Sequence, residues 1–195
     1  MGIYYLTGGQ VYLDHEFQRK TVAMEGGRLR VLPPDAPVSG QIYDAAGKKI
    51  LPGFIDIHTH GAVGVDVNGA APEDLDRIGR FFAGNGTTSW LCSILTDTEE
   101  QTGWCIDQCS AYRRGRPGGA ELLGIHLEGP FLASAYKGAM PENLLRRGDP
   151  ALLRAYQERA EGGIRYLTVS PAVEGVLDLI SVAKELGIVT AIGHS

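Results

Sequence analysis

Apolar residues follow two alternating patterns from about residue 50 to the end of the chain. Short continuous apolar runs, typical of strands buried on both faces of a parallel sheet, occur at 53–57, 87–95, 122–127, 164–169 and 188–192. Stretches with apolar residues at three- and four-residue spacing, typical of amphipathic helices, lie between them at 72–83, 98–114, 150–160 and 174–186. This alternation predicts an α/β fold in which helices cover a parallel sheet.

The residues before about 50 show a different pattern. Apolar runs at 3–6, 11–13, 21–24 and 29–32 are shorter, and Gly-Gly or Pro-Pro pairs interrupt the chain around them. This spacing predicts a small antiparallel β structure. The change of pattern therefore predicts two parts, a small β-rich segment at residues 1–51 and a β/α region at residues 52–195.

The composition narrows the classes of function. The formal net charge is −5 and 44 % of the residues are hydrophobic, which is typical of a globular protein and argues against a nucleic-acid-binding surface. No apolar run reaches the roughly 18 residues that a membrane-spanning helix needs. The first residues lack the pattern of a secretory signal, and three cysteines, an odd number, argue against a disulfide framework. We therefore expect a cytoplasmic protein with neither nucleic-acid nor membrane partners.

The first candidate site lies at the end of the strand predicted at 53–57. Side chains alternate along a strand, so His58 and His60 are expected on one face, with Ile55 and Ile57 on the opposite face beneath helices. Two imidazoles at the carboxyl end of a parallel strand can bind one metal ion, because ligands bind at that end of α/β sheets. The alternative is that they are two polar residues in a loop.

The second candidate site lies at the end of the strand predicted at 122–127. Alternation places Glu128 and His126 on one face and Leu123 on the other. A carboxylate at the end of a buried strand is unfavourable unless it is paired or binds a cation. A capping or salt-bridge role remains the alternative for Glu128, and we expect His126 to be a hydrogen-bonded buried histidine rather than a metal ligand.

The third candidate site is His194, which follows the apolar run at 188–192. Each signal is weak by itself, but three strands of one β/α series then end in a histidine or glutamate. Together, His58, His60, Glu128 and His194 suit a divalent metal ion. Nitrogen and carboxylate donors favour zinc, with iron, manganese or cobalt as alternatives.

Four motifs resemble a known enzyme superfamily and one of its families. Leu-Pro-Gly-Phe-Ile-Asp-Ile-His-Thr-His-Gly at 51–61 resembles the first barrel strand of the amidohydrolase superfamily. His-Leu-Glu-Gly-Pro-Phe-Leu at 126–132, Lys-Gly-Ala at 137–139 and Gly-His-Ser at 193–195 resemble the N-acetylglucosamine-6-phosphate deacetylase family. The resemblance spans the chain and implies an incomplete (β/α)8 TIM-like barrel of about five strands, with a small N-terminal β-sandwich segment.

The resemblance also implies a reaction and a set of ligands. Glu128 and His194 would bind the main catalytic ion, and His58 and His60 would complete a second metal site that some members of the family lack. The family hydrolyses the N-acetyl amide of an amino-sugar phosphate, here N-acetylglucosamine 6-phosphate, to the free amine and acetate. The metal polarises the acetyl carbonyl and lowers the pKa of a bound water.

Two features depart from the family pattern. The resemblance places Ala139 and Met140 at substrate contacts, but the family usually has histidine at the position of Met140, which keeps a different N-acetylated amino sugar open as substrate. The catalytic aspartate of the family is expected beyond Ser195, so no general base is assigned within the chain. We therefore expect a fragment that lacks a C-terminal segment, or a homo-oligomer. A catalytically silent assembly unit is the alternative from another functional class.

Overall fold

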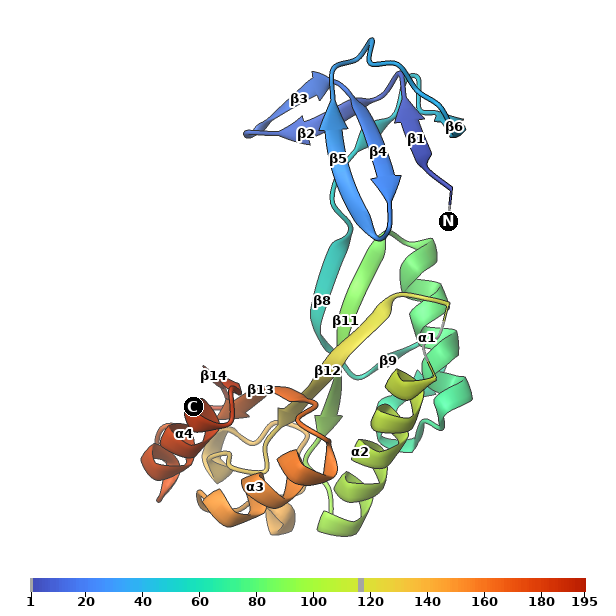
Figure 1. The fold of residues 1–195 in the computed structure, drawn as a ribbon. Coiled ribbons are helices and arrows are strands. Elements are labelled where there is room, and N and C mark those ends of the chain that lie inside the picture. Colours follow the sequence, from blue (N-terminus) through green and yellow to red (C-terminus); the bar gives the residue numbers. More distant parts are fainter. Residues whose placement is uncertain (1, 116–117) are drawn as a thin grey trace. The chain divides into compact units, whose positions relative to one another are not determined.

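The computed structural model describes residues 2–115 and 118–195, and the chain divides into two compact units, Met1–Pro52 and Gly53–Ser195. The first unit contains two small sheets (Figure 1). One has the order β5-β4-β1-β6, formed by Arg28–Leu32, Thr21–Glu25, Tyr4–Thr7 and Gln41–Asp44. The other has the order β3-β2-β7, formed by Glu16–Arg19, Gln10–Leu13 and Lys49–Ile50.

The strands of the first unit are not all antiparallel. The pairs β1–β4, β4–β5 and β2–β3 are antiparallel, as the sequence predicts, whereas β1–β6 and β2–β7 are parallel. The prediction of a purely antiparallel structure is therefore wrong for these two pairs. The physical reason is that tight turns join only neighbouring antiparallel strands, while β6 and β7 reach their partners through longer connections.

The second unit contains a five-stranded parallel sheet with the order β14-β13-β12-β11-β8. Its strands in chain order are β8 (Phe54–Thr59), β11 (Thr87–Leu95), β12 (Glu121–Glu128), β13 (Ile164–Val169) and β14 (Val189–Ile192). Four helices connect them: α1 (Pro72–Gly84), α2 (Glu99–Arg114), α3 (Pro150–Arg159) and α4 (Val176–Glu185). The strand–helix alternation predicted from the sequence is confirmed, and the curled sheet forms part of a barrel wall (Figure 1).

Local sequence explains where the helices begin. The Thr98 hydroxyl accepts a hydrogen bond from the backbone N–H of Gln101 and caps α2, and Asp149 caps α3 in the same way. Proline stands at the start of α1 and of α3, where a missing N–H leaves no intrahelical hydrogen bond unmade. None of the helices in the described part of the chain is both long and apolar enough to cross a bilayer.

The hydrophobic core lies between the helices and one face of the sheet. Its largest fully buried side chains come from both layers: Leu75, Ile78, Trp90, Ile94, Ile106, Ile125, Leu127, Leu153, Ile164, Leu167 and Leu179. Their spacing along each helix is the one that the apolar pattern predicts. Because the helices cover this face of the sheet, the remaining side chains of the strands lie on the opposite face.

The opposite face of the sheet carries apolar side chains that simple alternation assigns to the helix side. Ile57 and Leu123 line a cavity of about 510 Å³ together with Leu91 and Tyr166. Ile55 is 62 % exposed rather than covered by helices. The predicted orientations of Ile57 and Leu123 are therefore wrong, and the predicted cover of Ile55 by helices is absent.

Irregular strand pairing explains this error. The register shifts between Trp90 and Cys92, where β11 pairs with β8, and again between Trp90 and Leu91, where β11 pairs with β12. An extra residue at such a bulge resets the alternation of the strand that carries it. The side chains beyond each shift consequently change faces relative to a regular strand.

Candidate metal centre

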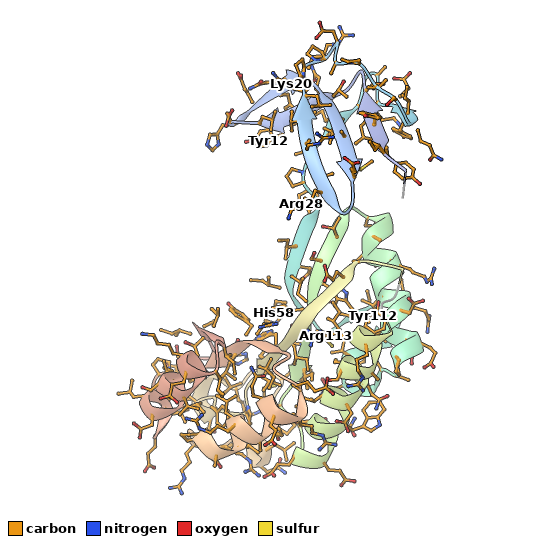
Figure 2. All side chains as sticks on the ribbon, viewed as in Figure 1. Tyr12, Lys20, Arg28, His58, Tyr112 and Arg113 are labelled. Carbon is orange, nitrogen blue, oxygen red and sulfur yellow. The ribbon has the colours of Figure 1, made fainter. Side chains whose placement is uncertain are left out.

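Three strands deliver polar side chains to one edge of the parallel sheet. His58 lies in β8 and His60 directly follows that strand, Glu128 is the last residue of β12, and His194 lies just beyond β14. Because all five strands run parallel, their carboxyl ends meet at the same edge. Figure 2 labels His58 on its strand.

All three histidines converge on the carboxylate of Glu128. Its Oε2 atom lies 2.9 Å from Nε2 of His60 and 3.5 Å from Nε2 of His58. Its Oε1 atom lies 3.0 Å from Nε2 of His194. The two Nε2 atoms of His58 and His60 are 3.0 Å apart. The four residues that the sequence singles out thus lie together, with one carboxylate oxygen facing the histidine pair and the other facing His194.

Backbone carbonyls set the orientation of two of these imidazoles. Nδ1 of His60 donates to the carbonyl of Ser93 at 3.0 Å, and Nδ1 of His194 donates to the carbonyl of Tyr136 at 2.9 Å. A carbonyl oxygen can only accept, so Nδ1 carries the proton in both rings. Nε2 points to Glu128 in both rings: it donates to the carboxylate when the ring is protonated, and it carries the lone pair when the ring is neutral. This is the orientation in which metal-binding histidines are usually held.

The electrostatics of the cluster keep Glu128 ionised. The hydrogen bond from His60 lowers the pKa of Glu128 to about 2, against the opposing effect of burial, and His194 adds to the shift. The hydrogen bond to Glu128 in turn raises the pKa values of both His60 and His194. A buried carboxylate that stays charged at neutral pH is what a cation site requires.

The donor atoms fit a borderline divalent ion. His58, His60 and Glu128 each offer one ligand atom, and these atoms lie within 4.8 Å of one another. The side chain of Glu128 is 9 % exposed, whereas those of His58 and His60 are 47 % and 37 % exposed, so a substrate could reach the cluster. Imidazole nitrogen with carboxylate oxygen is a set that zinc binds well.

His126 lies beneath this cluster and is fully buried. Its Nδ1 lies 2.8 Å from Oγ of Ser93, and its Nε2 lies 2.8 Å from Oγ1 of Thr168. Burial, with a smaller contribution from His58, lowers the pKa of His126 to about 4, so the ring is neutral at neutral pH. The expectation of a hydrogen-bonded buried histidine is confirmed.

Sequence reasoning misses the residues that hold His194. Ser170, which is fully buried, donates its hydroxyl to the carbonyl of His194 at 2.6 Å and accepts from the N–H of Ala133 at 2.8 Å. His194 itself has a positive φ of 53°, a conformation that non-glycine residues adopt only when their surroundings hold them there. A single serine after an apolar strand offers no sequence signal for this role.

The predicted substrate-contact residues lie in a turn that begins after Tyr136. Ala139 is exposed, whereas Met140 is only 3 % exposed. The turn passes close to the cluster, because a Cβ built on Gly138 would lie 3.5 Å from Cε1 of His194. The contact of Ala139 and Met140 with a substrate stays a prediction.

Sequence comparison finds similarity between this chain and known deacetylases. No family model matches it. The N-acetylglucosamine-6-phosphate deacetylase of Bacillus subtilis is 34 % identical over 165 residues, which cover 83 % of this chain and 42 % of that protein. The N-acetylgalactosamine-6-phosphate deacetylase of Escherichia coli O157:H7 is 31 % identical over 160 residues, or 82 % of this chain and 42 % of that protein.

The fold agrees with these matches. The structure of N-acetyl-D-glucosamine-6-phosphate deacetylase from Mycobacterium smegmatis, in complex with N-acetyl-D-glucosamine-6-phosphate, superimposes with a TM-score of 0.89. It is 26 % identical, and the match covers all of this chain and 50 % of that one. The chain is a relative of the N-acetylglucosamine-6-phosphate deacetylases. A second N-acetylglucosamine-6-phosphate deacetylase, from Pasteurella multocida, is 25 % identical with a TM-score of 0.88, and the match covers 99 % of this chain and 51 % of that one.

These matches confirm the resemblance that the motifs predict. They also show that the chain spans about 40 to 50 % of the length of the N-acetylglucosamine-6-phosphate deacetylases to which it is similar. A D-hydantoinase from Bacillus sp. AR9 shares the fold alone, at 21 % identity and a TM-score of 0.58.

Proposed function

We propose that this chain belongs to a metal-dependent hydrolase that removes the acetyl group of N-acetylglucosamine 6-phosphate. The observation that carries the proposal is the convergence of His58, His60 and His194 on the carboxylate of Glu128, at the carboxyl edge of a parallel sheet. Relatives that are similar over most of the chain are deacetylases of N-acetylated amino-sugar phosphates.

We assign metal binding to these four residues. Glu128 supplies the negative charge, and His58, His60 and His194 supply nitrogen donors. The carbonyls of Ser93 and Tyr136 keep Nε2 of His60 and of His194 directed at the site. When bound, a divalent ion such as zinc would polarise the acetyl carbonyl of the substrate and lower the pKa of a bound water. Zinc as the native ion and a cytoplasmic location remain predictions.

We also infer that the five-stranded sheet is the first part of an eight-stranded β/α barrel. Support comes from the parallel strand order and from the match to half of the two deacetylase structures. Under this proposal the general base lies outside the residues of this chain. We also assign substrate contact to the turn that carries Ala139 and Met140; the closeness of Gly138 in this turn to His194 supports the assignment.

Replacing Glu128 with glutamine tests the proposal. The variant keeps the size of the side chain but removes its charge, so we expect zinc binding at least about 100-fold weaker, since even residues that only support metal ligands contribute 10- to 100-fold. Zinc content and a zinc dissociation constant, measured with a competing chelator, give the result. Glu121→Gln is the matched control, because Glu121 is exposed at the opposite end of the same strand.

The outcomes separate the hypotheses. Unchanged zinc content and unchanged hydrolysis in Glu128→Gln would contradict the ligand assignment. Protein that binds zinc yet hydrolyses no N-acetylated amino-sugar phosphate, even when joined to any C-terminal segment encoded with it, would favour a silent assembly unit.

A second substrate has specific support. Met140 stands where the deacetylase family usually has histidine, and the similar protein of E. coli O157:H7 is named an N-acetylgalactosamine-6-phosphate deacetylase. A thioether donates no hydrogen bond, so a hydroxyl of the sugar would lose one partner. Comparison of kcat/KM for N-acetylglucosamine 6-phosphate and N-acetylgalactosamine 6-phosphate, measured on the chain joined to any C-terminal segment encoded with it, decides between them, since the preferred substrate has the higher value.

A further inference from the structure

A chain of buried hydrogen bonds crosses four strands beneath the metal centre. The backbone N–H of Thr59 in β8 donates to Oγ of Ser93 in β11 at 3.0 Å. Oγ of Ser93 lies 2.8 Å from Nδ1 of His126 in β12, and Nε2 of His126 lies 2.8 Å from Oγ1 of Thr168 in β13. Ser93 and His126 are fully buried, and Thr168 is 7 % exposed. Polar groups this deep in a sheet destabilise it unless they are hydrogen-bonded.

This series of hydrogen-bonded residues contacts both His58 and His60. The carbonyl of Ser93 accepts from Nδ1 of His60 at 3.0 Å. The ring of His126 packs edge-on against His58, with ring centroids 4.8 Å apart and an interplanar angle of 77°. Ser93 and His126 therefore orient one imidazole each, and the hydrogen bond between them joins the two contacts.

The strand register explains why a serine hydroxyl is needed here. Pairing between β8 and β11 shifts between Trp90 and Cys92, directly before Ser93. The hydroxyl of Ser93 accepts the N–H of Thr59 beside this shift, and so anchors the end of β8 that carries both histidines. Without the hydroxyl, that N–H would have to find another partner at an irregular point of the sheet.

One arrangement of the protons satisfies each of these hydrogen bonds and belongs to the proposal below. One lone pair of the Ser93 hydroxyl accepts from Thr59, so its own proton is free to go to Nδ1 of His126. In the arrangement in which Ser93 donates to Nδ1 of His126, Nε2 carries the ring proton and donates to Thr168. Every polar atom from Thr59 to His126 has a partner in this arrangement.

We propose that Ser93, His126 and Thr168 are positioning residues, which hold His58 and His60 in the orientation that binds the metal. This proposal rests on the proposed function, because it concerns the same metal centre. The three residues bind no ion themselves. They act through the anchored end of β8 and through the ring that supports His58.

Zinc affinity tests the proposal with two small changes and two matched controls. Ser93→Ala removes the hydroxyl but keeps the carbonyl that binds His60, and Thr168→Val removes the acceptor of His126. We expect each to weaken zinc binding about tenfold, the effect typical of residues that support metal ligands. The controls are Ser110→Ala, a buried serine of α2 whose hydroxyl has no partner among the described residues, and Thr102→Val, a buried threonine that contacts Tyr156.

Unfolding temperatures separate positioning from general stability. A purely structural role would lower the unfolding temperature of the zinc-free and zinc-loaded proteins equally and leave the dissociation constant unchanged. A positioning role reduces the stabilisation that added zinc produces, because that stabilisation follows the affinity. We expect this reduction in Ser93→Ala and Thr168→Val, and wild-type behaviour in both controls.

The outcomes distinguish the two proposals. If the wild-type protein binds no zinc or other divalent ion, the proposed function is wrong and this inference falls with it. If the wild-type protein binds zinc and both variants bind it equally well, only the inference is wrong. Should the variants fail to fold, ¹⁵N NMR of the His126 ring in the wild-type protein still tests the hydrogen-bond network. We expect the proton on Nε2, and a proton on Nδ1 would overturn the proposed network.

Discussion

Gly61 shows how one residue turns the chain directly behind the candidate metal ligands. Its φ of +140° is a conformation that other residues avoid, and a Cβ at this position would lie 1.9 Å from the carbonyl oxygen of Val65. The turn pairs β9 (Gly61–Ala62) with β10 (Val65–Asp66), and the N–H of Val67 then donates to the carbonyl of His60. The absence of a side chain at 61 is thus tied to the placement of His60.

We predict that Gly61→Ala destabilises the protein and weakens its metal binding. The new methyl group must displace the backbone at Val65, and an alanine must hold a backbone conformation that is strained for it. We therefore expect a loss of about 1–3 kcal/mol in the free energy of unfolding. Denaturant unfolding and zinc titration measure the two effects. Gly69→Ala is the control, since a Cβ there meets nothing within 4 Å. Equal unfolding midpoints for both variants would refute this reading of Gly61.

Among the elements, helices α2 and α3 are joined by a bidentate ion pair. Nε and Nη2 of Arg159 donate to Oδ1 and Oδ2 of Asp107 at 2.8 and 2.6 Å. Gly103 makes room for it, because a Cβ there would lie 2.1 Å from Nη1 of Arg159. The hydrogen bonds from Arg159 lower the pKa of Asp107. Both side chains are nearly half exposed, so solvent screens much of the attraction.

We predict that Asp107→Asn lowers stability only where the carboxylate is charged. The pKa of Asp107 is depressed in the folded state, so its contribution is complete above the unfolded value of about 3.9 and is lost as the pH falls through the folded value. At pH 7 we expect a loss of up to about 1 kcal/mol in the free energy of unfolding. Denaturant unfolding at pH 7 and in strong acid measures it, with the exposed neighbour substitution Glu158→Gln as control. A difference from wild type that persists in strong acid would contradict the ion-pair explanation.

At the scale of the whole molecule, the sheet of Gly53–Ser195 has two edge strands with exposed apolar side chains. Ile55 in β8 is 62 % exposed, and Ile192 in β14 is 74 % exposed. Unpaired edge strands offer backbone groups to other chains, and apolar side chains on them favour association. The cavity lined by Ile57, Leu91 and Leu123 adds apolar surface on the open face of the same sheet.

We predict that the 195-residue chain self-associates and binds a hydrophobic dye, and that charge on the sheet edges reduces both. Sedimentation velocity over a range of concentrations and dye fluorescence compare the wild type with a double variant, Ile55→Lys and Ile192→Lys. Leu177→Lys is the control, since Leu177 is 75 % exposed but lies on helix α4. If the double variant associates as strongly as the wild type, surfaces other than the sheet edges are responsible.

The sequence predicts the strands and helices of the second unit well, because their apolar residues are buried against one layer. Strands β11 and β13 match the predicted ranges 87–95 and 164–169. The apolar pattern does not reveal strands β3, β6 and β7 of the first unit, because they are two to four residues long and have no run of buried apolar side chains. Periodicity can reveal an element only where one side of it is covered.

The candidate site, too, is predicted in part by the sequence and in part only by the tertiary structure. The sequence alone singles out His58, His60, Glu128 and His194, since each comes at or after the end of an apolar run and the carboxyl ends of parallel strands meet at one edge of the sheet. Tertiary structure decides the rest: which carboxylate oxygen each imidazole faces, the position of Ile57 on the face of the sheet opposite the helices, and the partners of His126. The physical reason is that residue type and spacing belong to a single segment, whereas strand register and hydrogen-bond partners depend on the segment lying beside it.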